Sequence, residues 1–443
     1  MGVGVPSDTR SDGSRRRAYG PRADSDEEMK GCGMDRSENG DQPTGRPAAE
    51  DAALLEENLR LIEDRSDRVL NYFYASLFFE SPALRSLFPA AMDAQRDRLF
   101  RALVDAVRNI GDAETFVPML QQLGRDHRKY GVHTEDYASF GRALITAFER
   151  YSEDVWVPEL EDAWVRAYDY IASTMIDGAN QAAAKEPAWW PAEIVAHERR
   201  AEDIAVITVR PEGPYSYRAG QYTSIETPYR PRSWRHYSMA NAESADGLVE
   251  FHVRTVGAGF VSGPLVWSAA VGDVLKLGAP MGDMAIDKQS QRDVLCIAGG
   301  TGLAPIKAMI DEMTRWNTAR EVTVFLGVRQ AGDLYDIGAL GRIQALNRWL
   351  TVIPCISEDP TFIGERGTLA DVVARHGTWA EHDVFLCGSP DMTRATLSRL
   401  REIGVPDARI SFDDADDLHS ATAQVIDLRR SRTKRATQSL PRR

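Results

Sequence analysis

The hydrophobic pattern changes its period twice along the chain, and these changes limit the folds open to it. From Ala52 to about Lys185, apolar residues recur at intervals of three and four, which is typical of amphipathic helices. After Pro187 and Pro191 in "EPAWWPAE" the period becomes two, which is typical of short strands separated by turns. From Arg292 onward, strand and helix patterns alternate. We therefore predict a multi-domain chain, with an all-α part, an antiparallel β-barrel and an α/β part built on a parallel sheet.

We place the domain boundaries at these changes of period. Residues 51–186 form the predicted helical domain, 192–288 the barrel and 290–428 the α/β domain. Residues 1–50 are rich in Gly, Ser, Asp, Arg and Pro and have almost no apolar periodicity, so they bury too little surface to offset the entropy of ordering. They predict a disordered tail. Residues 429–443 are basic and predict a second, solvated tail.

The bulk properties exclude several classes of protein. A net charge of -13 argues against a nucleic-acid surface across the whole chain. No apolar run approaches the ~18 residues of a membrane helix, and no secretory signal opens the sequence. The four cysteines are scattered without metal-ligand spacing. We expect a cytoplasmic protein, a monomer or dimer, that acts on small molecules and binds neither nucleic acid nor membrane.

The barrel contains one strand whose residues suit a flavin. In Arg235-His236-Tyr237-Ser238, the guanidinium can donate two hydrogen bonds to a pyrophosphate. The Tyr237 ring can stack on the isoalloxazine, and the Ser238 hydroxyl can reach a nitrogen or oxygen of the flavin ring. Taken alone, these residues fit an exposed strand equally well.

Two glycine-containing turns in the α/β part suit a dinucleotide. The stretch Gly299 to Pro305 follows a buried strand and opens a helix, where main chain and helix N-terminus can approach phosphate. A second turn after "DVFL" lies at the same carboxyl edge, where ligands bind in open α/β sheets. In the barrel, a predicted helix start could hold the flavin pyrophosphate; ordinary structural turns are the alternative at each place. The candidate residues are Gly299, Gly300, Thr301, Gly302, Leu303, Ala304, Cys387 and Gly388 on the sheet, and Gly259, Val261 and Ser262 in the barrel.

In the order and spacing of these motifs, residues from about Ala192 to Asp414 resemble the ferredoxin–NADP reductase superfamily. The motif Gly220-Gln221-Tyr222 belongs to the same set. The resemblance implies FAD in the barrel, held by Tyr222 and by the strand with Arg235, His236, Tyr237 and Ser238. It implies NADH or NADPH on the sheet, a hydride transferred to the flavin, and electrons then released singly. Arg329 would bind a 2'-phosphate or be an ordinary surface residue, so the choice of nucleotide stays open.

The helical part contains a candidate haem ligand. His127 is the only histidine within its predicted helices, and neutral imidazole is a common ligand of haem iron. A single helical histidine is more often structural. Five further residues, however, fall at intervals that resemble the haem pocket of bacterial flavohaemoglobins. They are Tyr74, Phe88, Gln95 and Leu99 upstream, and Tyr137 ten residues downstream.

The flavohaemoglobin resemblance runs from about Ala52 to Asp414 and implies a nitric oxide dioxygenase. Haem b would hang from His127 and bind O2. Tyr74 and Gln95 would donate hydrogen bonds to that O2, Phe88 would pack on the porphyrin, Leu99 would bound the distal space, and Tyr137 would lie in the proximal pocket. The O2-bound haem would oxidise nitric oxide to nitrate, and the flavin would reduce the iron again.

Three positions depart from the family pattern. Asp126 precedes the axial histidine where the family has Lys, and Ala179 stands where a Glu strengthens that histidine. At the carboxyl end, Phe412 and Asp413 are present, but Ala415 stands where an aromatic covers the flavin. These changes predict slower haem reduction. They leave two alternatives open: a haem-based gas or redox sensor, and a flavin oxidoreductase with weak globin activity.

Overall fold

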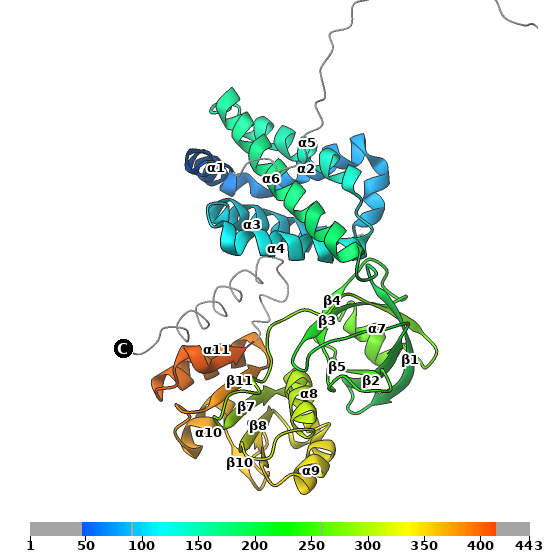
Figure 1. The fold of residues 1–443 in the computed structure, drawn as a ribbon, viewed down its shortest axis with the longest axis vertical. Helices are drawn as coiled ribbons and strands as arrows, with labels where there is room; N and C mark the ends of the chain where they lie inside the picture. Colours follow the sequence, from blue (N-terminus) through cyan, green and yellow to red (C-terminus); the bar gives the residue numbers. More distant parts are fainter. Residues whose placement is uncertain (1–46, 90–91, 258, 413–443) are drawn as a thin grey trace, which may run out of the picture. The chain divides into compact units, whose positions relative to one another are not determined.

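The computed structural model describes residues 47–89, 92–257 and 259–412. Six α-helices form the first domain (Figure 1). They are α1 (Ala49–Ile62), α2 (Ser66–Glu80), α3 (Asp93–Asn109), α4 (Ala113–His127), α5 (Thr134–Tyr151) and α6 (Pro158–Ala183). A 3-10 segment, η2 (Pro82–Leu87), follows α2, and a second one, η3 (Arg128–Tyr130), follows α4. Helix α1 begins at Ala49, two residues before the predicted start of the helical domain, and its apolar residues Leu55, Leu59 and Ile62 are buried.

Large side chains fill the core of the helical domain and bring its helices into close contact. Phe73, Phe116 and Phe148 are fully buried in one cluster. Helices α4 and α6 approach most closely at two glycines: a Cβ atom on Gly124 would lie 1.8 Å from the carbonyl oxygen of Met175. One on Gly178 would lie 2.2 Å from the carbonyl oxygen of Gln121. Main chain therefore packs directly against main chain at this helix crossing.

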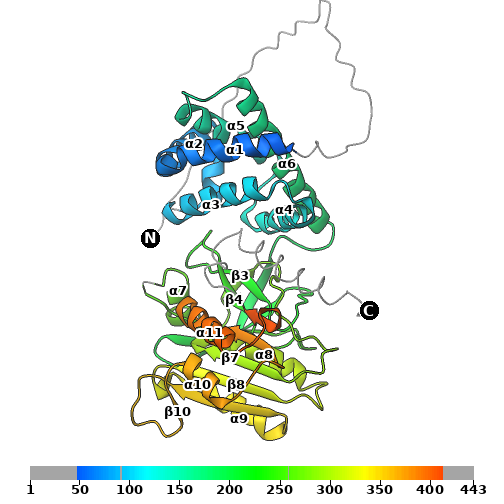
Figure 2. The ribbon, with the colours of Figure 1, turned by 90° about the vertical axis from the view of Figure 1, so that its left-hand side faces the viewer.

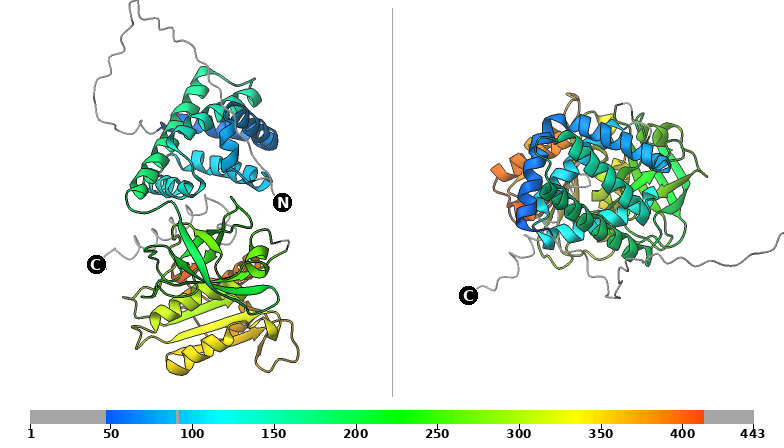
Figure 3. Two further views of the ribbon diagram at one scale, coloured as in Figure 1. Left: turned by 90° about the vertical axis from the view of Figure 1, so that its right-hand side faces the viewer. Right: turned by 90° about the horizontal axis from the view of Figure 1, so that it is seen from above.

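The second domain is the predicted antiparallel barrel. Its strands, in the order β4-β3-β6-β1-β2-β5, all pair antiparallel. An isolated bridge from Met239 to Phe251 links the end of β4 to β5 and nearly closes the barrel. Its strands are seen from another side in Figure 3. They are β1 (Trp190–Arg199), β2 (Ile204–Pro211), β3 (Tyr222–Glu226), β4 (Arg235–Ser238), β5 (Val249–Arg254) and β6 (Val274–Leu277), with helix α7 (Ser262–Trp267) after β5.

Strand β1 is absent from the sequence prediction, which started the barrel at residue 192. Pro191 is its second residue, and its missing N–H is tolerated there because that position does not need to donate. The carbonyl of Pro191 accepts a hydrogen bond from the main-chain N–H of Glu212. Ala192 and Ile194 are fully buried, so the strand contributes to the barrel core directly after the proline.

The third domain is the predicted parallel sheet, in the order β10-β9-β8-β7-β11-β12. Apolar residues of α8 and α9 pack on one face of the sheet, and those of α10 and α11 on the other (Figure 2). Three buried cysteines, Cys296, Cys355 and Cys387, lie on its strands. The elements are β7 (Val294–Gly299), α8 (Leu303–Met313), β8 (Val322–Val328), α9 (Ile337–Leu346), β9 (Leu350–Ile356), β10 (Glu365–Arg366), α10 (Leu369–His376), β11 (Asp383–Cys387), α11 (Pro390–Glu402) and β12 (Ile410–Phe412).

Candidate cofactor sites

The two predicted dinucleotide turns meet at the switch point of the parallel sheet. From β7 the chain continues to β8 and β9 on one side, and β11 is added on the other side. Ligands of open α/β sheets bind outside the carboxyl ends of the strands at such a point. The Gly299 turn follows β7, and the Gly388 turn follows β11. A Cβ atom on Gly388 would lie 3.3 Å from the Cα atom of Gly299, so the two turns touch.

Close main-chain packing explains the glycines in these turns. A Cβ atom on Gly302 would lie 2.4 Å from the carbonyl oxygen of Cys387. The side chains of Leu303, Ala304 and Cys387 are buried in the core of this domain. Leu303, Ala304 and Cys387 can therefore contact a nucleotide only through their main-chain atoms. Thr301 is partly exposed between them, in the 3-10 turn before α8.

An arginine that the sequence prediction missed lies beside this turn. A Cβ atom on Gly300 would lie 3.4 Å from Nη1 of Arg254, which ends β5 of the barrel. The Arg254 Nε donates to Asp203 at 2.7 Å. Nothing in the local pattern "FHVR" distinguishes this arginine, because only the packing of the two domains brings it to the glycine turn.

The predicted flavin strand, β4, pairs with β3. Ser238 is opposite Tyr222, Tyr237 opposite Thr223, and His236 opposite Ser224. The rings of Tyr222 and His236 lie 5.2 Å apart, edge to face. Burial raises the pKa of Tyr237 well above its ordinary value, so its phenol stays neutral. This strand pairing places Tyr222 beside β4, the strand that is predicted to bind the flavin.

The predicted pyrophosphate turn leads into α7, as expected. Gly259 has φ +40°, a left-handed value that favours glycine. Its carbonyl accepts a hydrogen bond from the Gly263 N–H at 2.7 Å. Ser262 is the first residue of α7, and the Val261 side chain is buried in the barrel core. Val261 can therefore meet a ligand only through its main chain.

His127, the last residue of α4, has the ring orientation that an iron ligand needs. Its Nδ1 atom lies 2.8 Å from the carbonyl oxygen of Leu123. A carbonyl can only accept, so Nδ1 carries the proton and the lone pair of Nε2 is available. Burial lowers the pKa of His127, partly offset by the charge of Asp126, and this favours the neutral imidazole. The donor atom therefore fits haem iron.

An aromatic cluster contains the predicted distal residues Tyr74 and Phe88. Their ring centroids lie 5.6 Å apart, and Phe78 packs against both. Burial raises the pKa of Tyr74 well above its ordinary value. Among the residues described, the Tyr74 hydroxyl has no recorded hydrogen-bond partner, so it can donate to a ligand. Arg85 donates to the carbonyls of Phe88 and Pro89, which fixes the end of η2.

The other predicted globin residues lie on three helices. Leu99 packs against the core from α3, and Gln95 is on the same helix, with its side chain outside the described set. Burial raises the pKa of Tyr137, on α5, to about 12. The Tyr137 carbonyl accepts a hydrogen bond from Tyr168 of α6 at 2.6 Å. The Ala179 side chain contains no hydrogen-bond acceptor. The Leu123 carbonyl accepts the hydrogen bond of the His127 imidazole instead.

The remaining predicted features are less informative. Phe412 ends β12 beside Leu386, whereas Asp413 and Ala415 lie outside the described residues. Arg329 is exposed after β8.

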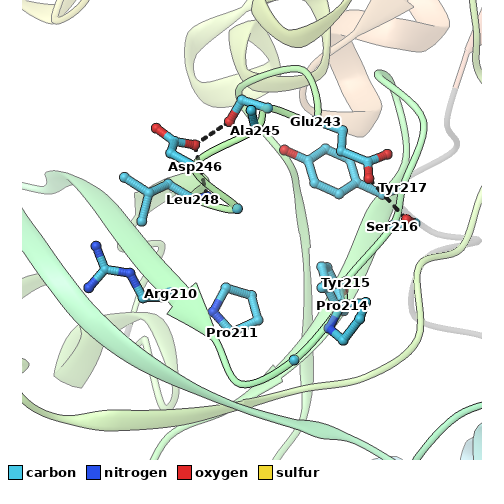
Figure 4. A pocket seen from close by; sticks show the side chains of 13 residues that line it. Arg210, Pro211, Pro214, Tyr215, Ser216, Tyr217, Glu243, Ala245, Asp246 and Leu248 are labelled. Carbon is cyan, nitrogen blue, oxygen red and sulfur yellow. Dashed lines mark hydrogen bonds between the residues drawn. The ribbon is translucent and has the colours of Figure 1, made fainter.

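A cavity of about 340 Å³ lies between the loop before β3 and the loop before β5 (Figure 4). Tyr215, Tyr217 and Glu243 line it, and none of the predicted site residues does. It therefore belongs to none of the three predicted cofactor sites.

Three family models match the chain in succession. Residues 71–175 match the globin family. Residues 191–286 match the oxidoreductase FAD-binding domain, and residues 296–398 match the oxidoreductase NAD-binding domain. A flavohemoprotein of Bacillus subtilis (strain 168) is 23% identical over 385 residues, which span 81% of this chain and 95% of that protein. In the kind and order of its domains the chain matches the flavohaemoglobins.

Two further comparisons concern the whole chain and its reductase part. A flavohemoglobin structure from Malassezia yamatoensis covers 83% of the chain and 98% of its own length, with a TM-score of 0.69 and 18% identity. The electron transfer component of a xylene/toluene monooxygenase from Pseudomonas putida is 35% identical over 219 residues, 48% of this chain and 61% of that protein. The reductase part thus has a higher identity to this electron-transfer protein than the whole chain has to the Bacillus flavohemoprotein.

The predicted fold class and the family resemblance are confirmed. The chain is an NAD(P)H-dependent oxidoreductase whose modules are those for haem, FAD and NAD(P)H. Its globin and reductase modules support an electron relay from NAD(P)H through flavin to haem. Across the described residues, no helix combines the length and apolar character needed to cross a membrane.

Proposed function

We propose that this protein is a nitric oxide dioxygenase of the flavohaemoglobin type, which oxidises nitric oxide with O2 to nitrate and uses NAD(P)H as the electron source. Bound haem would supply the oxygen chemistry, and bound FAD would divide the two electrons of a hydride into single ones. The residues of the chain bind, orient and tune these groups. Its substrates are then all small molecules.

The observation that carries the proposal is the pair of functional groups in the globin domain. His127 presents an unprotonated Nε2, because its Nδ1–H is held by the Leu123 carbonyl at 2.8 Å. Tyr74 presents a neutral hydroxyl with no recorded partner among the described residues. One group suits the iron and the other suits a polar diatomic ligand. A reductase module in the same chain provides the electrons that repeated turnover needs.

The reductase residues have supporting roles. Arg235, Tyr237 and Ser238 on β4 would hold the flavin, with Tyr222 opposite Ser238 on the neighbouring strand. The touching turns at Gly299 and Gly388 would receive the nucleotide through their main chain. Phe412 ends β12, two strands from β7, and would contribute from the same edge.

The absorption spectrum of the purified protein, before and after NADH, tests the relay. We expect haem and flavin bands, with both cofactors reduced under anaerobic conditions. With O2 present, nitric oxide should be consumed with nitrate formation, two molecules per NADH, because each needs one electron and NADH supplies two. Reduced flavin beside permanently ferric haem would contradict the relay.

A haem-based sensor is the second candidate, and one observation favours it. The His127 imidazole is hydrogen-bonded to a neutral carbonyl, which strengthens donation to iron less than a carboxylate does. Slow nitric oxide consumption combined with tight, reversible O2 binding would favour the sensor. Fast consumption coupled to NADH oxidation would exclude it.

A further inference from the structure

A lysine of the globin domain is buried against the barrel. The Lys129 side chain is 2% exposed. Its Nζ atom donates to Asp126 Oδ1 at 2.6 Å and to Ser224 Oγ, on β3, at 2.8 Å. Both domains lie in the compact unit that begins at Pro43. The ammonium is therefore shared between the end of the iron-ligand helix and the strand next to the flavin strand.

Aromatic rings surround the same ammonium. Nζ of Lys129 lies 5.1 Å from the centroid of the Tyr130 ring and 5.5 Å from that of the Trp234 ring. These distances are within the range of cation–π attraction. The two rings lie 6.4 Å apart, and the Tyr130 ring lies 5.7 Å from the His127 imidazole. A continuous series of rings thus runs from His127 to Trp234.

The far end of this series is attached directly to the flavin strand. Trp234 is 8% exposed and precedes Arg235, the first residue of β4. Ser224, which accepts from Lys129, is paired across the sheet with His236 of β4. Main chain and strand pairing both connect the Lys129 contact to the four residues that would hold the flavin.

The loop before β4 contacts the globin domain at a second place. Arg232 has φ +63°, a strained conformation for a residue with a side chain. Its main-chain N–H donates to Glu226, and its Nη1 donates to the carbonyl of Ser86 in η2 at 3.2 Å. The loop therefore contacts the helical domain at two residues close to β4, Arg232 and Trp234.

A buried ion pair does not by itself explain why these groups are present. Removing two charges from water costs free energy, and a buried pair is often no more stable than apolar residues of similar volume. Such pairs are better suited to fixing one arrangement of two elements than to stabilising a fold. The Asp126–Lys129 pair fixes the end of α4 against β3.

We propose that Lys129, Tyr130 and Trp234 form a bridge between the two domains, hereafter the Lys129 bridge. The bridge fixes the position of β4 relative to His127 and thereby sets the rate of electron transfer from flavin to haem. In this step one electron leaves the reduced flavin and ferric iron becomes ferrous, and no bond forms or breaks. The inference rests on the proposed function, because it requires haem at His127 and flavin at β4. The three bridge residues are positioning residues.

Two substitutions test the bridge in the holoenzyme without leaving a charge unpaired. Ser224→Ala removes the hydrogen bond from Lys129 to the barrel and keeps the Asp126–Lys129 pair. Trp234→Leu removes the last ring of the series. With NADH added anaerobically under CO, flavin bleaching and the Soret shift are followed by stopped flow. We expect flavin reduction at the wild-type rate, and haem reduction slowed by at least about tenfold, or ~1.4 kcal/mol in the barrier.

A matched control is available in the barrel. Lys276 has the same kinds of partner: it is paired with Glu226 at 2.8 Å and lies 4.8 Å from the Trp189 ring. Its side chain is 41% exposed, so it differs from Lys129 mainly in burial. Lys276→Met should leave haem reduction unchanged. Trp234→Phe keeps a ring at the bridge and should recover most of the rate that Trp234→Leu loses.

Hydrogen exchange of the same proteins without cofactors provides a second readout. Faster exchange in residues 227–233 of Ser224→Ala is expected if the bridge holds the loop. Wild-type haem-reduction rates in both variants would overturn the bridge. Slowing by Lys276→Met as much as by Ser224→Ala would also overturn it. If NADH does not reduce the wild-type haem at all, the proposed function fails first, and that result is distinct from normal rates in the variants.

Discussion

His127 Nδ1 lies 2.8 Å from the carbonyl oxygen of Leu123, one turn earlier in the same helix. The imidazole is thus oriented by its own helix and not by a side chain of α6. A main-chain acceptor cannot be removed by substitution, so this orientation persists in almost any variant of the domain. A neutral acceptor also donates less electron density through the ring than a carboxylate would.

Replacement of His127 by Ala should abolish haem binding, because it removes the Nε2 lone pair on which the site depends. The measurement is the ratio of Soret to protein absorbance after purification in the presence of haem. His133→Ala is the control, since His133 is exposed before α5. Equal haem content in the His127→Ala and wild-type proteins would show that another residue binds the iron.

Tyr74→Phe should increase the rate of O2 dissociation roughly three- to tenfold, because one hydrogen bond contributes about 0.5–1.5 kcal/mol. Flash photolysis or stopped flow on the ferrous protein measures this rate. Tyr72→Phe is the matched control: Tyr72 is on the same helix, but its ring packs against Tyr151. The distal role of Tyr74 would be refuted by an unchanged dissociation rate.

Gly124→Ala should destabilise the helical domain, because the new methyl would lie 1.8 Å from the Met175 carbonyl oxygen. Overpacking of this kind costs on the order of 1–3 kcal/mol. Gly341→Ala, in α9, is the control: nothing lies within 4 Å of its Cβ position, and helix propensity favours Ala there by up to ~1 kcal/mol. Thermal unfolding followed by circular dichroism should show opposite shifts. Equal shifts would contradict the tight helix crossing.

Acid should destabilise the contact between barrel and sheet domain through Glu250. Burial raises the pKa of this carboxyl, but hydrogen bonds from His252 and Lys307 outweigh that effect and lower it to about 2. The folded-state pKa is below the ordinary value of 4.5. The stabilisation is therefore complete above about pH 4.5 and is lost as the pH falls toward 2, by up to about 3 kcal/mol.

Urea unfolding between pH 6 and pH 3 measures this dependence. Glu250→Gln should weaken it, because the amide does not titrate. Glu402→Gln removes an exposed partner of Arg399 and should change the slope little. If the Glu250→Gln protein kept the full wild-type pH dependence, the stabilising carboxylate would have to be elsewhere.

Much of the fold follows from local patterns. The change of hydrophobic period at Pro187 and Pro191 locates the barrel, and the alternation after Arg292 predicts the parallel sheet. Periodicity succeeds here because each element buries one side, and burial determines which positions are apolar. Pro191 shows the limit of local rules: its sequence context predicts a break, yet it lies within β1, at a position where no main-chain N–H is needed.

The sites were predictable only where one segment carries the chemistry. The turn at Gly299 and the strand at Arg235 can be recognised from adjacent residues. Arg254 could not be recognised, because the sheet domain brings Gly300 to it from far along the chain. Lys129 and Trp234 could not be recognised for the same reason, because their contact joins residues far apart in the chain. Asp126 was noted only as a departure from the family, and its partner became visible only in three dimensions.

The burial of the cysteines determines how far reactive small molecules can modify them. Burial raises the pKa of both Cys296 and Cys355 to about 12, so almost no thiolate forms at neutral pH. Nitrosating and oxidising agents react with thiolates that they can reach. Cys387 is buried as well, so under the proposed function the three cysteines that the structure describes would be protected from S-nitrosylation.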